Sequence, residues 1–151
     1  MRTAVFPGTF DPITIGHESI VKRALPLFDK IIIAVGINAS KKNLFPLEKR
    51  KEWIKKVFKT EGNISVATYD GLTIDFCKKV KANYILRGLR TSADFEFERG
   101  IAQMNHAMEN KIETIFIISI PEFSAINSTI VRDIIMHGGD AGRFIPKGIS
   151  I

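Results

Sequence analysis

A three-layer α/β domain with a five-stranded parallel sheet is the fold that this sequence predicts. Five short apolar segments alternate along the chain with longer segments whose apolar residues recur at helical spacing. Apolar strands that are joined by crossover helices form parallel sheets, which helices cover on both faces. The chain has 151 residues, which is the usual size of one domain. We therefore expect a single domain over residues 1–151.

Each expected element follows from its own local pattern. Strands are predicted at residues 2–6, 30–36, 64–69, 83–87 and 114–119, each bounded by turn residues or charges. Three apolar stripes predict helices that face the sheet: the first has Ile20, Val21, Ala24, Leu25 and Phe28, the second Leu72, Phe76 and Val80, and the third Phe97, Ile101, Met104 and Met108. A last helix is predicted over residues 128–137, with Ile130, Val131, Ile134 and Ile135 facing inward and Gly138 and Gly139 ending it.

A further helix is predicted in the most basic part of the chain, between Lys41 and Lys59. This part holds 8 of the 22 basic residues, and it contains Trp53, Ile54, Val57 and Phe58 at helical spacing opposite the charges. The pattern favours an amphipathic helix with a solvated basic face. Pro46 precedes it, and we expect the proline within the first turn, without a side-chain cap.

The net charge of +6 predicts an anionic partner, which could be a nucleic acid, a phosphorylated metabolite or an acidic lipid. A nucleic-acid-binding module would interleave aromatic residues with the cations. The aromatic residues of the basic helix face inward instead, so we expect no nucleic acid partner.

Two further classes are disfavoured by what the chain lacks. No stretch approaches the ~20 consecutive apolar residues that span a bilayer, and no secretory leader is evident, so we expect a cytoplasmic protein without membrane contact. The single cysteine, Cys77, allows neither an intrachain disulfide nor a cysteine zinc cluster, and we expect it to be packed in the core.

Glycines, hydroxyls and cations follow all five expected strands. They occur in residues 7–17, 36–42, 71–73, 87–90 and 123–129. Ligands of parallel α/β sheets bind outside the carboxyl ends of the strands, where these five loops meet. The sequence therefore predicts a site there for a heavily phosphorylated ligand.

The common phosphate-binding and hydrolytic motifs are missing. The chain has no Gly-x-Gly pair, no P-loop and no Gly-x-Ser-x-Gly elbow, and Val21 stands where a zinc protease needs its second histidine. No protein metal site is expected. Thr14 and His17 mark one helix start and residues 126–132 mark another, and free N–H groups at helix starts attract anions. The expected chemistry is phosphate positioning and charge neutralisation.

These two helix starts resemble the motifs of a nucleotidyltransferase superfamily. Residues 14–17 (TIGH) are similar to its Thr/His-x-Gly-His motif, and residues 126–132 (INSTIVR) to its Ile-Ser-Ser-Thr-x-x-Arg motif, with Asn127 where serine is commoner. Further blocks at 7–13, 40–42, 47–50, 87–90, 94–98 and 139–140 make residues 4–146 resemble the bacterial phosphopantetheine adenylyltransferases.

The resemblance implies a Rossmann-like fold and a complete reaction. The phosphate of 4′-phosphopantetheine would attack the α-phosphorus of ATP in line, giving dephospho-coenzyme A and pyrophosphate, with Mg²⁺ on the ATP phosphates. A phosphate monoester is already largely ionised at neutral pH, so the nucleophile needs no general base. The resemblance also implies a homohexamer, and coenzyme A is a candidate feedback ligand.

Site residues carry over by position. The resemblance implies catalytic roles for His17, Lys41 and Arg90. The phosphopantetheine-binding residues would be Thr9, Lys41, Leu72, Thr73 and Arg87. The ATP-binding residues would be Thr9, Phe10, His17, Gly88, Leu89, Arg90, Glu98, Phe123, Ser124, Ala125, Ile126, Asn127, Ser128 and Thr129. A related enzyme with another acceptor, such as nicotinamide mononucleotide or glycerol or choline phosphate, is the alternative, although residues 40–42 and 87–90 count against it.

Overall fold

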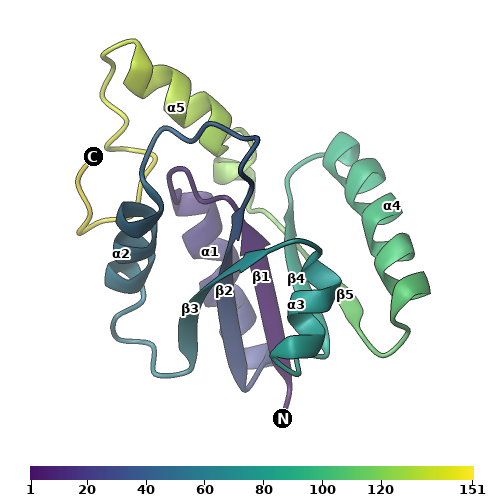
Figure 1. Ribbon diagram of the computed structural model, residues 1–151. Helices are drawn as coiled ribbons and strands as arrows, with labels where there is room; N and C mark the ends of the chain where they lie inside the picture. Colours follow the sequence, from purple (N-terminus) through teal and green to yellow (C-terminus); the bar gives the residue numbers. More distant parts are fainter.

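A single parallel sheet of five strands forms the centre of the computed structural model, which describes all 151 residues (Figure 1). The strands are β1 (Thr3–Gly8), β2 (Lys30–Ile37), β3 (Ile64–Asp70), β4 (Tyr84–Leu89) and β5 (Glu113–Ile118). Their order across the sheet is β3-β2-β1-β4-β5. The α/β fold class and all five predicted strands are confirmed, with ends that differ by at most two residues. Because the order reverses beside β1, the loops after β1 and β4 border the crevice where ligands of such sheets bind.

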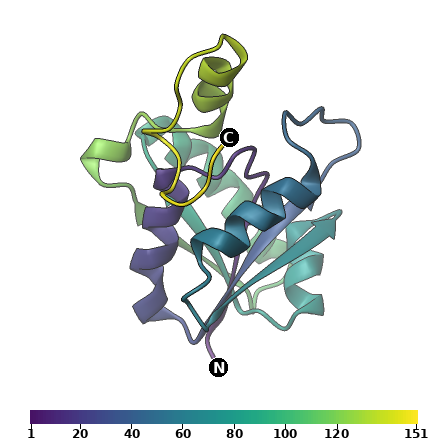
Figure 2. The ribbon, with the colours of Figure 1, turned by 90° about the vertical axis from the view of Figure 1, so that its left-hand side faces the viewer.

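The helices connect the strands and lie on both faces of the sheet. They are α1 (Ile15–Ala24), α2 (Leu47–Val57), α3 (Thr73–Lys79), α4 (Ser92–Met108) and α5 (Ser128–Met136), with short 3₁₀ turns at Leu25–Leu27 and Pro121–Phe123. Figure 1 shows α4 on the opposite side of the molecule from α2 and α5, and Figure 2 shows α1 and α2 side by side. None of the helices has the length and apolar character that crossing a bilayer requires.

Each face of the sheet carries its own apolar cluster. On one face Ala4, Phe6, Ile31, Ile33 and Leu86 pack against buried residues of α1, α2 and α5. On the other face Val5, Ile32, Ala34 and Ile85 pack against Ile74, Phe76 and Cys77 of α3. Alternate residues of one strand thus enter different clusters, as the two-residue repeat of a strand requires. The expected core position of Cys77 is confirmed.

Leu86 in β4 is fully buried, so its truncation tests the larger cluster. Leu86→Ala is expected to lower the free energy of unfolding by about 2–5 kcal/mol, because the removed methyl groups leave a cavity that the packed neighbours fill only in part. Urea titration followed by circular dichroism measures this loss. Leu27→Ala, at a side chain that is 48% exposed, is the matched control and should change stability by less than about 1 kcal/mol. Equal losses in both variants would show that Leu86 is not a core residue.

The predicted inward stripe of α4 is wrong. Phe97 and Met104 are 71% and 64% exposed, and α4 has no buried residue. The face of α4 that meets the sheet carries Asp94 and Glu98, whose carboxylates pair with Arg90 and Arg87. The Glu98–Arg87 pair joins α4 to β4, while the apolar stripe of α4 stays largely exposed.

Four single residues also depart from the sequence prediction. Leu72, expected in a stripe that faces the sheet, is the N-cap of α3 and is 56% exposed. Arg50 belongs to the basic helix α2 but is only 3% exposed, because its guanidinium donates hydrogen bonds to two backbone carbonyls beneath the helix. Ile130 in α5 is 50% exposed, since Val131 is the residue that this helix buries. The start of α2 lacks a side-chain cap, as expected, but Pro46 is the N-cap residue and the first turn begins at Leu47.

Candidate active site

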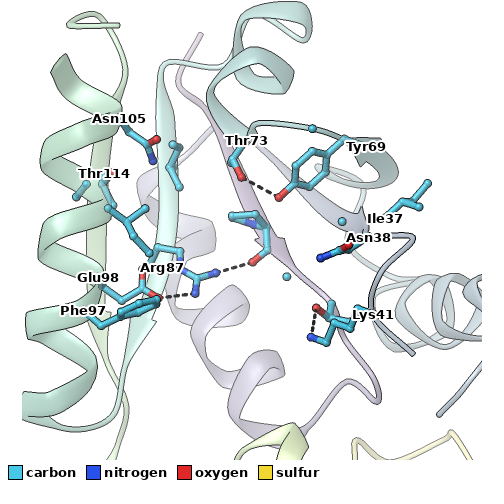
Figure 3. A pocket seen from close by; sticks show the side chains of 18 residues that line it. Ile37, Asn38, Lys41, Tyr69, Thr73, Arg87, Phe97, Glu98, Asn105 and Thr114 are labelled. Carbon is cyan, nitrogen blue, oxygen red and sulfur yellow. Dashed lines mark hydrogen bonds and ion pairs between the residues drawn. The ribbon is translucent and has the colours of Figure 1, made fainter. Parts of the chain in front are cut away.

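Two cavities adjoin at the carboxyl edge of the sheet. The first, of about 370 Å³, lies between the strand ends, α3 and α4, and Figure 3 shows its lining. The second, of about 310 Å³, lies over the starts of α1 and α5. Both volumes are in the range of small-molecule sites. The residues common to both linings are Pro7, Gly8, Thr9, Lys41, Arg87 and Glu98, which we call the shared edge.

His17 is held in one orientation by the start of α1. Thr14 is the N-cap, and its side chain accepts a hydrogen bond from the His17 amide. In return, the Thr14 amide donates to Nδ1 of His17 over 3.0 Å. A nitrogen that accepts from an amide carries no proton, so the neutral ring carries its proton on Nε2. His17 lines the second cavity, and it is therefore a hydrogen-bond donor there.

The surroundings of His17 favour the neutral ring. Burial, reinforced by the positive charges of Arg87 and Arg90, lowers the pKa of His17 from 6.5 to about 4. In the unfolded chain the same ring titrates near pH ~6.5. Between these two values the unfolded state binds more protons, so acidification through this window destabilises the fold, whereas above it the ring contributes no pH dependence.

This difference predicts a measurable effect of pH on stability. Between pH 7 and pH 5, the Tm of the wild-type protein should fall more steeply than that of His17→Gln, which has no titrating ring. Differential scanning fluorimetry across a buffer series measures both slopes. Parallel slopes would mean that His17 titrates alike in the folded and unfolded states.

Arg87 at the end of β4 is fixed by three hydrogen bonds. Its Nε and Nη2 donate to the two carboxylate oxygens of Glu98 over 3.1 and 2.6 Å, and its Nη1 donates to the Pro7 carbonyl over 2.7 Å (Figure 3). Such two-pronged pairing orients the planar guanidinium group. Glu98 thus holds Arg87 where the two cavities meet.

Arg90, two residues before α4, is fixed in a similar way. Its Nε and Nη2 donate to the Asp94 carboxylate over 3.0 and 3.2 Å, and its amide donates to the same group over 3.1 Å. Thr91 caps α4 by accepting from the Asp94 amide. Both site arginines are therefore anchored to carboxylates of one helix.

The loop after β1 brings a hydroxyl to the shared edge. Lys41 donates to the Thr9 hydroxyl over 3.1 Å, which joins the loops that follow β1 and β2. Phe10 has a φ of +50°, and its ring packs against His17 at 5.0 Å between centroids. A Cβ at Gly8 would lie 3.0 Å from the Phe10 ring, so a side chain there would require the ring to shift.

The start of α5 forms the far wall of the second cavity. Asn127 caps the helix, its Oδ1 accepting from the Ile130 amide over 2.9 Å. Ser128 donates to the Pro12 carbonyl over 2.9 Å, and Arg132 donates to the Asp11 carbonyl over the same distance. The asparagine therefore serves as the helix cap, and the two other side chains tie α5 to the loop after β1.

Most of the sequence-predicted residues lie together in the two linings. The first cavity contains Thr9, Lys41, Thr73, Arg87 and Glu98. The second contains Thr9, Phe10, His17, Lys41, Arg87, Gly88, Arg90, Glu98, Ile126, Asn127, Ser128 and Thr129. Leu72, Leu89, Phe123, Ser124 and Ala125 line neither cavity, and the roles expected for these five stay predictions.

Some lining residues were not singled out from the sequence. Asp94 and Arg132 line the second cavity, and each lies within a block that resembles a family motif, which was the available signal. Tyr69 and Asn105 line the first cavity. Tyr69 donates to or accepts from the Thr73 hydroxyl at 2.8 Å, a contact that no local pattern predicts.

The chain closely resembles known proteins over its whole length. It matches the cytidylyltransferase-like family over residues 5–134. Proteins named phosphopantetheine adenylyltransferase from Flavobacterium psychrophilum and Bacteroides thetaiotaomicron are 55% and 50% identical to it, over 100% of the chain and 99% of each relative. Among solved structures, a putative nicotinate-nucleotide adenylyltransferase from Vibrio parahaemolyticus has a TM-score of 0.72 and 19% identity, over 96% of this chain and 94% of that one. The latter likeness shows a shared fold.

Proposed function

Because this chain belongs to the cytidylyltransferase-like family, and within it to the phosphopantetheine adenylyltransferases, we propose that it transfers the adenylyl group of ATP to 4′-phosphopantetheine. The products are dephospho-coenzyme A and pyrophosphate. The observation that supports this most directly is the shared edge, where two cavities meet at Lys41, Arg87 and the Thr9 hydroxyl. Two phosphorylated substrates that enter from either side would bring their phosphates together there.

The reaction is one in-line displacement at the α-phosphorus. An oxygen of the phosphopantetheine phosphate forms the new bond to phosphorus, and the bond from phosphorus to the pyrophosphate oxygen breaks, so its electron pair leaves with pyrophosphate. The attacking oxygen is already an anion and needs no base. What the protein must supply is alignment and positive charge, and Lys41, Arg87 and Arg90 supply the charge.

His17 would act as a neutral donor to the reacting phosphate. Its proton lies on Nε2, because the Thr14 amide occupies Nδ1. Donors that are fixed before the reaction stabilise charge that develops in the transition state without a reorganisation cost. His17 would therefore hold the α-phosphate while Arg90 holds the leaving phosphates and Arg87 the phosphate of the acceptor.

Magnesium would be carried by the triphosphate. The two carboxylates of the cavities, those of Asp94 and Glu98, are paired with arginines, and no group of three or more His, Cys, Asp or Glu side chains clusters in a metal-binding arrangement. This donor set fits an ion whose ligands are phosphate oxygens and water, which is how Mg²⁺ is commonly bound in nucleotide sites. When bound, the ion would neutralise phosphate charge.

The family resemblance is the reason to expect a homohexamer, and the exposed apolar stripe of α4 offers a surface on which copies of the chain could pack. Phe97, Ile101, Met104 and Met108 are exposed along one face of this helix, and copies of the chain that pack there would bury them. Sedimentation equilibrium should give six times the chain mass of 16.9 kDa, and Met104→Glu should dissociate the assembly. A monomer in the wild-type protein would contradict this assembly.

Other expected properties follow from the same substrates. Since ATP is consumed, we place the reaction in the cytoplasm. Coenzyme A contains both the pantetheine arm and the adenylate, so it would compete for both cavities as a feedback ligand. Duplex and single-stranded DNA should show no binding at about 0.15 M salt, because Trp53 and Phe58 of the basic segment are buried and cannot stack on bases.

Pyrophosphate release measured with Mg-ATP and each acceptor in turn tests the function. Release is expected with 4′-phosphopantetheine and not with nicotinamide mononucleotide, nicotinate mononucleotide or glycerol phosphate, and EDTA should stop it. Mass spectrometry should identify dephospho-coenzyme A as the product. Release with another acceptor alone would keep the adenylyl transfer but replace the substrate.

A further inference from the structure

We propose that Arg50 and Asp11 are positioning residues that set the place of Lys41 relative to Thr9. This inference rests on the proposed adenylyl transfer. Neither side chain lines the first or the second cavity, so neither is expected to touch a substrate. Both instead hold the backbone of the loop at residues 38–46, which we call the Lys41 loop, against the loop that follows β1.

Arg50 reaches out from α2 to both loops. Its Nε donates to the Phe45 carbonyl over 3.0 Å, and its Nη1 donates to the Thr9 carbonyl over 2.8 Å. One rigid guanidinium therefore fixes the spacing between the end of the Lys41 loop and Thr9. The ammonium of a lysine is a single point of charge and could not span both acceptors in the same way.

Asp11 binds the same segment through its backbone amides. Its Oδ2 accepts from the Leu44 amide over 2.8 Å, and its Oδ1 accepts from the Phe45 amide over 2.9 Å. Phe45 is thus held through its amide by Asp11 and through its carbonyl by Arg50. Asp11 is itself anchored, because its own carbonyl accepts from Arg132 of α5.

The charged groups of Asp11 and Arg50 are both buried, and burial distinguishes Arg50 from the lysines of the basic helix α2. Asp11 and Arg50 are 1% and 3% exposed, whereas Lys49 and Lys55 of α2 lie at the surface. Burial lowers the pKa of Arg50, and the negative charge of Asp11 counteracts this. Buried charges cost solvation energy, so their hydrogen bonds must be made within the protein.

The contacts of Arg50 and Asp11 affect the position of Lys41 and Thr9 at the shared edge. The Lys41 loop has no helix or strand of its own, and Lys41 reaches the Thr9 hydroxyl at 3.1 Å. The two groups belong to segments that Arg50 and Asp11 tie together. Because a displacement of about 1 Å at a reacting centre can cost about 100-fold in rate, holding these segments together contributes directly to the reaction.

A matched pair of variants tests the role of Arg50. Arg50→Met and Lys55→Met each remove one cation from α2, but only the first breaks contacts with the two loops. Arg50→Met is expected to lower kcat by about 100-fold, with little change in the KM for ATP, and Arg50→Lys to recover part of the loss. Lys55→Met should keep the wild-type kcat. Circular dichroism selects conditions in which every variant is folded.

A double-mutant cycle separates positioning from general destabilisation. Lys41→Met should reduce kcat about tenfold less in the Arg50→Lys background than in the wild-type background. The reason is that a displaced Lys41 already contributes little to the rate. Losses that multiply independently would overturn the proposal. Arg50→Lys keeps the buried positive charge, so the proposal can be tested with this variant if Arg50→Met does not fold.

Hydrogen exchange gives a readout that does not depend on activity. The amides of Leu44 and Phe45, which donate to Asp11, should be protected in the wild type and exchange faster in Asp11→Asn and Arg50→Lys, whereas amides of β1 keep their protection. Unchanged exchange at both amides would show that Asp11 and Arg50 do not hold the loop. An inactive wild-type enzyme with these protected amides would instead refute only the proposed function.

Discussion

Replacing His17 with alanine is expected to lower kcat by about 10²–10³-fold, the usual cost of losing one fixed donor to a charged transition state. The KM for ATP should change less, because Arg90 and the starts of α1 and α5, which also line the second cavity, would still contact the phosphates of the ground state. Pyrophosphate release under saturating substrates measures the loss. The kcat of the wild type should also show no histidine titration between pH 6 and pH 8, since the pKa of His17 is lowered to about 4.

His137→Ala is the matched control for this variant. That ring lies at the end of α5, with 78% of its side chain exposed, and should be replaceable without loss of rate. His17→Gln carries an amide donor and should recover part of the rate. A kcat that rises or falls about an imidazole pKa near pH 7 in the wild type, and not in His17→Gln, would identify His17 as a proton-transfer group instead.

The second large effect is expected at Arg87. Arg87→Met should raise the KM for phosphopantetheine by about 10–100-fold, because hydrogen bonds to a charged group contribute about 1.5–3 kcal/mol. Initial rates at varied acceptor and saturating ATP measure it. The KM for ATP should change much less, since Arg90 and His17 still line the second cavity.

Arg99→Met controls for the lost charge. Arg99 lies on α4 and pairs with Glu96 at the surface, where such pairs contribute little. Its removal should leave both KM values unchanged. Equal increases in the KM for ATP and for phosphopantetheine in Arg87→Met would mean that Arg87 does not distinguish the two substrates.

The fold was largely predictable because the strands are short and apolar and each is bounded by turn residues or charges. Residues 30–36 and 64–69 read as strands from their own composition and were found as β2 and β3. The outward stripe of α4 was not predictable in this way. Helical spacing identifies an apolar face, but it does not show which face meets the sheet. The Glu98–Arg87 pair joins α4 to β4, and its partners belong to two different elements.

The site was predictable where residues follow strand ends or helix starts. His17, Arg87 and Ser128 occupy such places, and the structure brings them around the two cavities. Arg50 could not be found by this reasoning. It stands among lysines that are solvated, and only the three-dimensional approach of the Thr9 and Phe45 carbonyls reveals its partners.

A histidine that neither gains nor loses a proton serves both directions of a reaction equally. The hydrogen bond from the Thr14 amide to His17 keeps the ring in one tautomer, so the same donor would hold the α-phosphate while pyrophosphate attacks dephospho-coenzyme A to regenerate ATP. By microscopic reversibility, synthesis and pyrophosphorolysis would then use one arrangement of side chains. The direction of net flux would be set by the removal of pyrophosphate rather than by the protein.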